Sequence, residues 1–230
     1  MIIASIQDVC LSPRFAIPIL RDSSQPLEIL VRLLSLIALL ALSIYAPTTG
    51  VAANLALADA LKERVLGNQA APITIVEYAS LTCSHCKIFH QDVLPALMKA
   101  YIETGKAKLV FRDFPLDGLA LRASMMARCA PTDRYFKYID ALYQTQSAWA
   151  ADSNPLIALA RVGKLGGMKQ TDFDACMKDE DLFNGILRSR QVAAIEFSVE
   201  GTPTFIINGK KMTQPATFES FDSILKKLTP

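Results

Sequence analysis

The tetrapeptide Cys83-Ser84-His85-Cys86 follows an apolar, β-branched run, Ile73-Thr74-Ile75-Val76, and opens a segment whose apolar residues recur at helical spacing. A strand, a short turn and a helix that begins at paired cysteines are typical of a thiol–disulfide redox centre. At a helix start, the sulfur of Cys83 faces unpaired N–H groups and the positive end of the helix dipole, which both favour the thiolate. Taken alone, the same spacing also fits half of a zinc site.

The metal alternative depends on His90. It lies four residues after Cys86, so the two side chains share one face of the predicted helix. A structural zinc site needs a fourth ligand, and the other histidine of the chain is His85, inside the motif itself. We therefore interpret His90 as a helix-surface or packing residue and expect neither a metal nor a small-molecule cofactor. We also expect Pro95 to kink this helix.

Length and charge limit the class of protein. The chain has 230 residues, enough for one domain with a large insertion. Lys and Arg total 24 against 22 Asp and Glu, and no basic tract is present that could follow a phosphate backbone. Nucleic-acid binding is therefore not expected. The apolar fraction of 51% is high, and much of the excess lies before residue 60.

This N-terminal region has the pattern of an export signal. Residues 33–46 are uncharged and mostly apolar, a run too short for a bilayer span, and small-residue patterns follow it. We predict an export segment over residues 1–58 with cleavage after Ala58, and an uncleaved membrane anchor is the alternative. Residues 1–28 are rich in proline and acidic residues for a signal, which suggests a misassigned start. Removal of the segment discards Cys10 and leaves an even set of four cysteines.

The rest of the chain divides into three parts: residues 59–117, which carry two predicted strands and the cysteine helix, residues 118–198, and residues 199–230. A short helix is expected over residues 59–65. The middle part is helical throughout, with capping residues at the helix starts. We predict its helices at residues 119–129, 132–146, 155–165, 171–177 and 181–197. The last part reads as a strand, an Asn208-Gly209 hairpin turn and a helix with one apolar face.

Two further features bear on chemistry. Glu77 lies in an apolar strand six residues before Cys83. It is either a solvated strand-end residue or a buried carboxylate that exchanges protons with the active-site cysteines. Cys129 and Cys176 lie near the ends of two predicted helices and can pair only if those ends meet. In an oxidising compartment we predict a structural disulfide between them, with two buried free thiols as the alternative.

The strand-CxxC-helix and the distant Gly201-Thr202-Pro203-Thr204-Phe205 segment together resemble the thioredoxin fold. With the helical insertion, residues 62–230 are similar to the DsbA family of bacterial periplasmic thiol oxidases. The motifs that carry the resemblance also include Val65-Leu66-Gly67-Asn68, Val76-Glu77-Tyr78 and Arg112-Asp113-Phe114-Pro115-Leu116. The extra pair of cysteines is similar to the alphaproteobacterial branch of the family. The expected fold class is thus α/β, a thioredoxin fold with an inserted all-helical subdomain.

The resemblance implies roles for individual residues. Cys83 is the exposed nucleophile that forms a mixed disulfide, and Cys86 is the partly buried resolving thiol. Pro203 is a cis-proline that faces the pair, and Thr202 offers backbone groups to an extended substrate. Glu77 matches the acidic residue of the family beneath the site. Ser84 departs from the proline of many members, which leaves the redox potential open.

His85 indicates the direction of the reaction. An imidazole between the cysteines can donate or carry positive charge toward the Cys83 sulfur, which stabilises the thiolate and the reduced protein. The disulfide form is then oxidising. The alternative is a solvent-exposed spacer. We expect a monomeric periplasmic oxidase that donates disulfides to exported proteins and is reoxidised by a DsbB-like membrane quinone reductase. A reductase or isomerase on the same fold is the second hypothesis, and a metal-binding module is the third.

Overall fold

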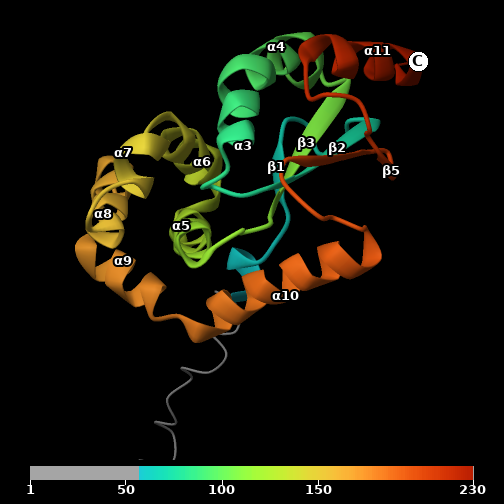
Figure 1. The fold of residues 1–230 in the computed structure, drawn as a ribbon. Helices are drawn as coiled ribbons and strands as arrows, with labels where there is room; N and C mark the ends of the chain where they lie inside the picture. The colour runs from blue at the N-terminus through green and yellow to red at the C-terminus, as the bar shows by residue number, and fades with distance from the viewer. Residues whose placement is uncertain (1–56, 230) are drawn as a thin grey trace, which may run out of the picture. The chain divides into compact units, whose positions relative to one another are not determined.

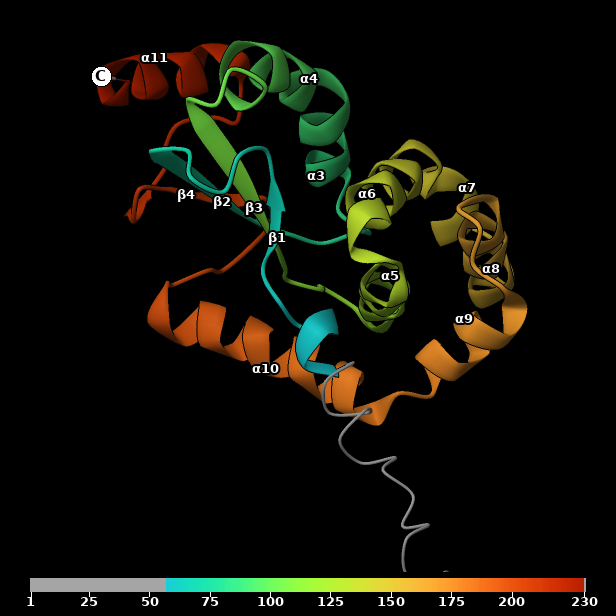
Figure 2. The same ribbon diagram turned by 180° about the vertical axis from the view of Figure 1, so that it is seen from behind.

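The computed structural model describes residues 57–229, which form a mixed sheet with helices on both faces and a block of helices beside it (Figure 1, and from behind in Figure 2). The predicted export segment, residues 1–58, lies outside the described residues except for its last two positions. Its cleavage, the anchor alternative and the suspected start therefore stay predictions. No helix within residues 57–229 has the length and apolar character that a membrane crossing requires.

The sheet has five strands in the order β1-β3-β2-β4-β5. Its central strands, β2 (Ile73–Ala79) and β3 (Ala107–Asp113), are parallel. The other strands, β1 (Arg64–Leu66), β4 (Thr204–Ile207) and β5 (Lys210–Lys211), pair antiparallel with their neighbours. Parallel neighbours need a crossover connection, and here the helical segment that begins at the cysteine motif supplies it.

Successive residues of β2 point to opposite faces of the sheet. Ile75 packs in the same cluster as residues of α11 (Phe218–Leu228), whereas Tyr78 packs in a cluster with Ala193 of α10 (Glu180–Glu196) on the other face. The two helices lie on opposite sides of the sheet in both views (Figure 1, Figure 2). Glu77 is two residues after Ile75, so its side chain points to the face that the cysteine-bearing helix covers.

The cysteine-bearing helical segment is not a uniform α-helix. α3 (Ser84–Ile88) continues into a π-helical turn at Phe89–Val93, then α4 (Leu94–Leu97) and a second π-helical turn at Met98–Ile102. In the first π-helical turn the hydrogen bonds span five residues instead of four, directly ahead of Pro95, which has no N–H to donate. The kink predicted at Pro95 stays a prediction.

Between β3 and β4 the described chain is helical. The helices are α5 (Gly118–Cys129), a 3₁₀ turn (Thr132–Arg134), α6 (Tyr135–Gln144), α7 (Gln146–Ala150), α8 (Pro155–Leu165), α9 (Gln170–Met177) and α10. Their buried core is continuous with the redox motif, because Cys83 and Cys86 belong to the same buried cluster as Tyr143 and Trp149. The helical block therefore forms one wall around the cysteines.

Two predictions of secondary structure were wrong. Residues 57–60 form a helical turn, but Arg64–Leu66 is strand β1, because it pairs with residues 109–111 of β3. The helix predicted over residues 132–146 starts with a 3₁₀ turn and divides at Thr145, where α6 ends and α7 begins. The Thr145 hydroxyl donates to the carbonyl of Ala141 at 2.7 Å, a local bond that competes with regular helix continuation.

Candidate active site

Cys83 caps the N-terminus of α3. Its backbone is extended, with φ −77° and ψ 122°, and its sulfur accepts a hydrogen bond from the backbone N–H of Cys86 at 3.3 Å. This is the N-cap position, where a side-chain acceptor satisfies an N–H group that has no partner within the helix. The sequence prediction placed the Cys83 sulfur at a helix start, and the structure places it there.

Cys83 is less exposed than the resemblance implied. Its relative exposure is 8%, and Cys86 is fully buried. The Cys83 sulfur lies against the loop before β4, 3.2 Å from the carbonyl oxygen of Thr202, to which it donates when it is protonated. The Thr202–Pro203 peptide bond is cis, as the resemblance implied. The loop before β4 thus covers the nucleophile that was expected to be open to solvent.

The surroundings of Cys83 lower its pKa from 9.0 to about 5. A hydrogen bond from the Cys86 side chain makes the largest contribution, and burial opposes it. Thr202 and the backbone N–H groups of Cys86 and His85 lower the pKa of Cys83 further. The Thr202 hydroxyl, buried and without another hydrogen-bond partner among the described residues, is available to a thiolate at this position. With a pKa of about 5 the thiolate of Cys83 predominates at neutral pH, and the bond that the thiol donates to the Thr202 carbonyl belongs to the protonated form alone.

Cys86 shows the opposite shift. Burial is the main cause that raises its pKa above 9.0, and the hydrogen bond with Cys83 and the negative charge of Glu77 raise the pKa of Cys86 further. The surroundings thus favour the thiolate at Cys83 and the thiol at Cys86. This asymmetry suits a dithiol in which Cys83 is the attacking and leaving sulfur and Cys86 carries a proton.

Glu77 is fully buried, which agrees with the second of the two interpretations that the sequence allowed. Its Oε2 and Oε1 lie 2.9 and 3.2 Å from Nε2 of His90. The His90 ring is itself buried and lies with its centroid 4.4 Å from that of Tyr143. A buried carboxylate next to an imidazole can hold or pass a proton close to Cys86.

His90 is thus a packing residue, and its partner, Glu77, was not predicted from the sequence. The spacing of Cys86 and His90 places both side chains on one helix face, which was related above only to a metal site. Strand alternation along β2 also places Glu77 beneath that face. The two spacings together could therefore have predicted the contact between Glu77 and His90. Within residues 57–229, no three His, Cys, Asp or Glu side chains are grouped so that they could hold a metal ion.

His85 is exposed at the first turn of α3. Its backbone N–H helps to lower the pKa of Cys83, and its imidazole makes no hydrogen bond or ion pair within the described residues. The predicted effect of the ring on the thiolate stays a prediction. The ring lines a cleft of about 360 Å³ that lies beside the nucleophile, together with Ile88, Pro203 and Met212.

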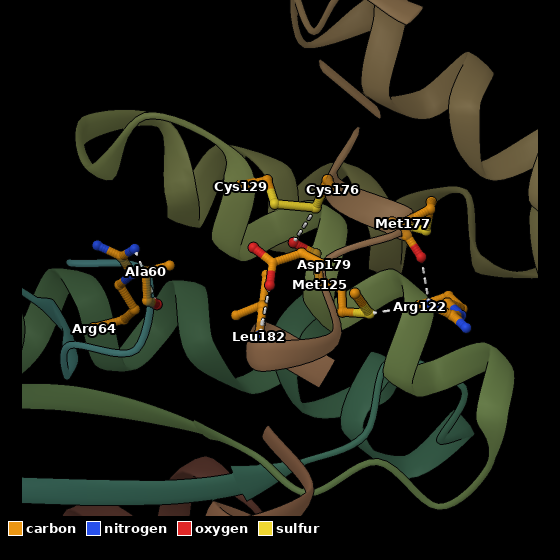
Figure 3. Close-up of a disulfide and its surroundings, with 9 residues drawn as sticks. All are labelled: Ala60, Arg64, Arg122, Met125, Cys129, Cys176, Met177, Asp179 and Leu182. Atoms are coloured by element: carbon orange, nitrogen blue, oxygen red, sulfur yellow. Dashed lines mark hydrogen bonds between the residues drawn. A yellow bond between two sulfur atoms is a disulfide. The ribbon is translucent and has the colours of Figure 1, made fainter. Parts of the chain in front are cut away.

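The structure joins Cys129 and Cys176 by a disulfide, the outcome preferred over two free thiols. The bond connects α5 to α9, and Figure 3 shows the two sulfurs joined next to Met125. The Cys176 sulfur lies 3.2 Å from the carbonyl oxygen of Met125. Nearby, Arg122 donates to the carbonyl of Met177 at 2.6 Å at the end of α9. The bridge thus lies within the helical block, whereas Cys83 and Cys86 are free thiols.

Comparison with known proteins agrees with this geometry. The sequence profile of the family described as thioredoxin matches residues 59–227. The crystal structure of Wolbachia pipientis alpha-DsbA1 is 32% identical, with a TM-score of 0.68 over 73% of this chain and 90% of that chain. A Novosphingobium aromaticivorans structure, described as a protein-disulfide isomerase, is 25% identical with a TM-score of 0.65 over 73% of this chain and 98% of its own.

A Rickettsia typhi protein, provisionally named a protein-disulfide oxidoreductase, is 32% identical over 148 residues. The match covers 64% of this chain and 55% of the rickettsial protein, so the chain spans about half the length of this relative. The predicted fold class is confirmed. The chain belongs to the thioredoxin family, in the DsbA-type branch that the motifs indicated and that Wolbachia alpha-DsbA1 represents.

Proposed function

We propose that the protein is a protein-disulfide oxidoreductase that donates the Cys83–Cys86 disulfide to exported proteins. The observation that supports this most strongly is the opposite direction of the two pKa shifts, downward at Cys83 and upward at Cys86. Stabilisation of the Cys83 thiolate stabilises the reduced protein, and a stable reduced form makes the disulfide form a stronger oxidant.

The transfer has two exchange steps. A substrate thiolate attacks Cys83 in the oxidised protein, so that the Cys83–Cys86 bond breaks, a mixed disulfide forms at Cys83, and the electron pair leaves with the Cys86 sulfur. A second substrate thiolate then attacks the substrate sulfur of the mixed disulfide and expels Cys83 as a thiolate. The substrate is oxidised to a disulfide and the two cysteines are reduced. Because leaving thiolates of low pKa depart faster, Cys83 is suited to the second step.

The sulfur of Cys86 needs a proton after the first step, because burial raises its pKa. The Glu77–His90 pair is the nearby group that can supply it, with two short contacts between carboxylate and imidazole. We therefore assign Glu77 to proton exchange with Cys86 and Thr202 and Pro203 to the contact with substrate. His85 is assigned to thiolate stabilisation.

We further propose that the protein works as a monomer in the periplasm and is reoxidised by a DsbB-like membrane quinone reductase. The apolar, small-residue pattern before residue 58 and the even cysteine set support export to an oxidising compartment. Cell fractionation, followed by mass measurement of the mature N-terminus, tests location and cleavage together. Recovery of the whole chain from the cytoplasm would contradict this part of the proposal.

A reductase or isomerase is the second candidate, because the Novosphingobium structure of the same fold is described as a protein-disulfide isomerase. The reduction potential separates the candidates. We expect a value well above that of thioredoxin, about −270 mV, and toward that of DsbA, about −120 mV. A value near that of thioredoxin would support a reductase.

The experiment is oxidation of a reduced model protein by the purified, oxidised chain, with the potential measured against glutathione. Wild-type protein should oxidise the substrate stoichiometrically. Cys83→Ser should be inactive, whereas Cys86→Ser in reaction with a disulfide-bonded substrate should accumulate the mixed disulfide at Cys83. Equal trapping by both variants, or no oxidation by the wild-type protein, would refute the assignment.

A further inference from the structure

The turn in front of the redox helix is hydrogen-bonded from the helical block. Gln146, the first residue of α7, is buried, with a relative exposure of 7%. Its Nε2 donates to the carbonyl of Leu81 at 2.8 Å and to the carbonyl of Cys83 at 3.0 Å. Both hydrogens of the side-chain amide are used by backbone oxygens of the redox turn. Since both partners are acceptors, the side chain must face them with its NH₂ group.

A second side chain of the same block acts on the same turn. The Tyr143 hydroxyl, one helical turn before Gln146 near the end of α6, donates to the carbonyl of Ser80 at 3.2 Å. Three carbonyls of the segment that leads into the nucleophile thus accept from two neighbouring side chains, more than 60 residues later in the chain. Buried carbonyls keep fixed directions where such donors satisfy them.

These bonds determine which backbone groups surround the Cys83 sulfur. The Cys83 carbonyl accepts from Gln146 and from the N–H of Lys87, so it is held toward α7 and the first helical turn. The sulfur then faces the N–H of Cys86 at the N-cap position. A turn free to rotate would let the sulfur leave this position and lose the donors that favour the thiolate.

We propose that Gln146, supported by Tyr143, is a positioning residue that keeps the Cys83 sulfur at the N-cap of α3, within reach of the N–H groups that stabilise its thiolate. The inference rests on the proposed function, in which the thiolate of Cys83 is the leaving group. It assigns a role to the helical block: the block not only covers the cysteines but also fixes the geometry of their turn.

The test compares Gln146→Met with Gln144→Met. Methionine is similar in length to glutamine and cannot donate. Gln144 is exposed, two residues earlier, and its amide bonds to Asp140, away from the cysteines. In the reduced proteins with the Cys129–Cys176 bridge intact, Gln146→Met should raise the pKa of Cys83 by about half a unit or more, measured by thiolate absorbance.

The second readout is the equilibrium with glutathione, which Gln146→Met should shift by about threefold or more toward the oxidised protein. Gln144→Met should leave both readouts at their wild-type values. If Gln146→Met does not fold, Tyr143→Phe is the variant to measure. It deletes only the hydroxyl that donates to the carbonyl of Ser80, and it should also raise the pKa of Cys83.

Native spectra together with a wild-type Cys83 pKa in Gln146→Met would overturn the inference, as would an equal shift in Gln144→Met. If Gln146→Met is unfolded, a Cys83 pKa in Tyr143→Phe equal to that of the wild-type protein would overturn the inference. If the proposed function were wrong, the result would differ: the wild-type protein itself would have an ordinary Cys83 pKa or would not oxidise the model substrate.

Discussion

Replacement of Cys86 by alanine should raise the pKa of Cys83, because a hydrogen bond from the Cys86 side chain is the largest contribution that lowers it. The variant removes this donor and keeps the backbone N–H groups of residues 85 and 86 at the helix start. It also leaves Cys83 as the single free thiol of the described part of the chain, which makes the titration simple to interpret.

The size of the effect follows from the strength of such bonds. A hydrogen bond to a charged group contributes about 1.5–3 kcal/mol. At about 1.4 kcal/mol per pKa unit, its loss corresponds to about one to two units. Starting from about 5 in the wild-type protein, we expect the pKa of Cys83 to be about 6 to 7 in Cys86→Ala. It should stay below 9.0 because the N-cap contacts persist.

The assay is the ultraviolet absorbance of the thiolate across a pH series, checked by the pH dependence of the alkylation rate. The control is the oxidised wild-type protein, in which Cys83 cannot titrate. An unchanged pKa in Cys86→Ala would show that the Cys86 thiol does not stabilise the thiolate. An ordinary thiol pKa of about 8.5 would show that the helix start contributes nothing. Either result refutes the reasoning.

Three other predictions follow from the same geometry. The pKa of Cys83 is lower in the folded than in the unfolded protein, so the reduced protein should gain stability over the oxidised one as pH rises from about 5 toward 9. The gain should be about 1.4 kcal/mol per pH unit in this range and absent below about pH 5. Urea unfolding of both forms across this range measures it. A flat difference would contradict the lowered pKa. Glu77→Gln removes the carboxylate beside His90 and a negative charge that raises the pKa of Cys86, so the pH dependence of the step that expels the Cys86 sulfur should shift toward lower pH in stopped-flow measurements of substrate oxidation. An unchanged pH profile would separate Glu77 from Cys86. Replacement of Cys129 and Cys176 together by alanine opens a loop of 47 residues and should lower the free energy of unfolding by about 4 kcal/mol in urea denaturation, and an equal stability of variant and wild type would contradict a structural role.

The elements of the redox centre were predictable because their signals are local. The apolar run before Cys83 and the helical spacing after it define a strand and a helix with the sulfur between them. Strand alternation also places Glu77 on the buried face. Strand β1 was missed because three residues carry too little pattern, and its pairing with β3 decides its conformation.

The sequence by itself determined the class of fold, the redox pair and the helical block, because hydrophobic period, turn residues and capping residues act over a few neighbouring positions. The tertiary structure alone decided the contacts that tune the pair. His90 meets Glu77 across 13 residues, and Gln146 reaches the carbonyl of Cys83 across 63 residues. It also decided that Thr202 covers the nucleophile. These contacts depend on how separate elements pack on one another, and no local pattern encodes which side chain of one element will face which carbonyl of another.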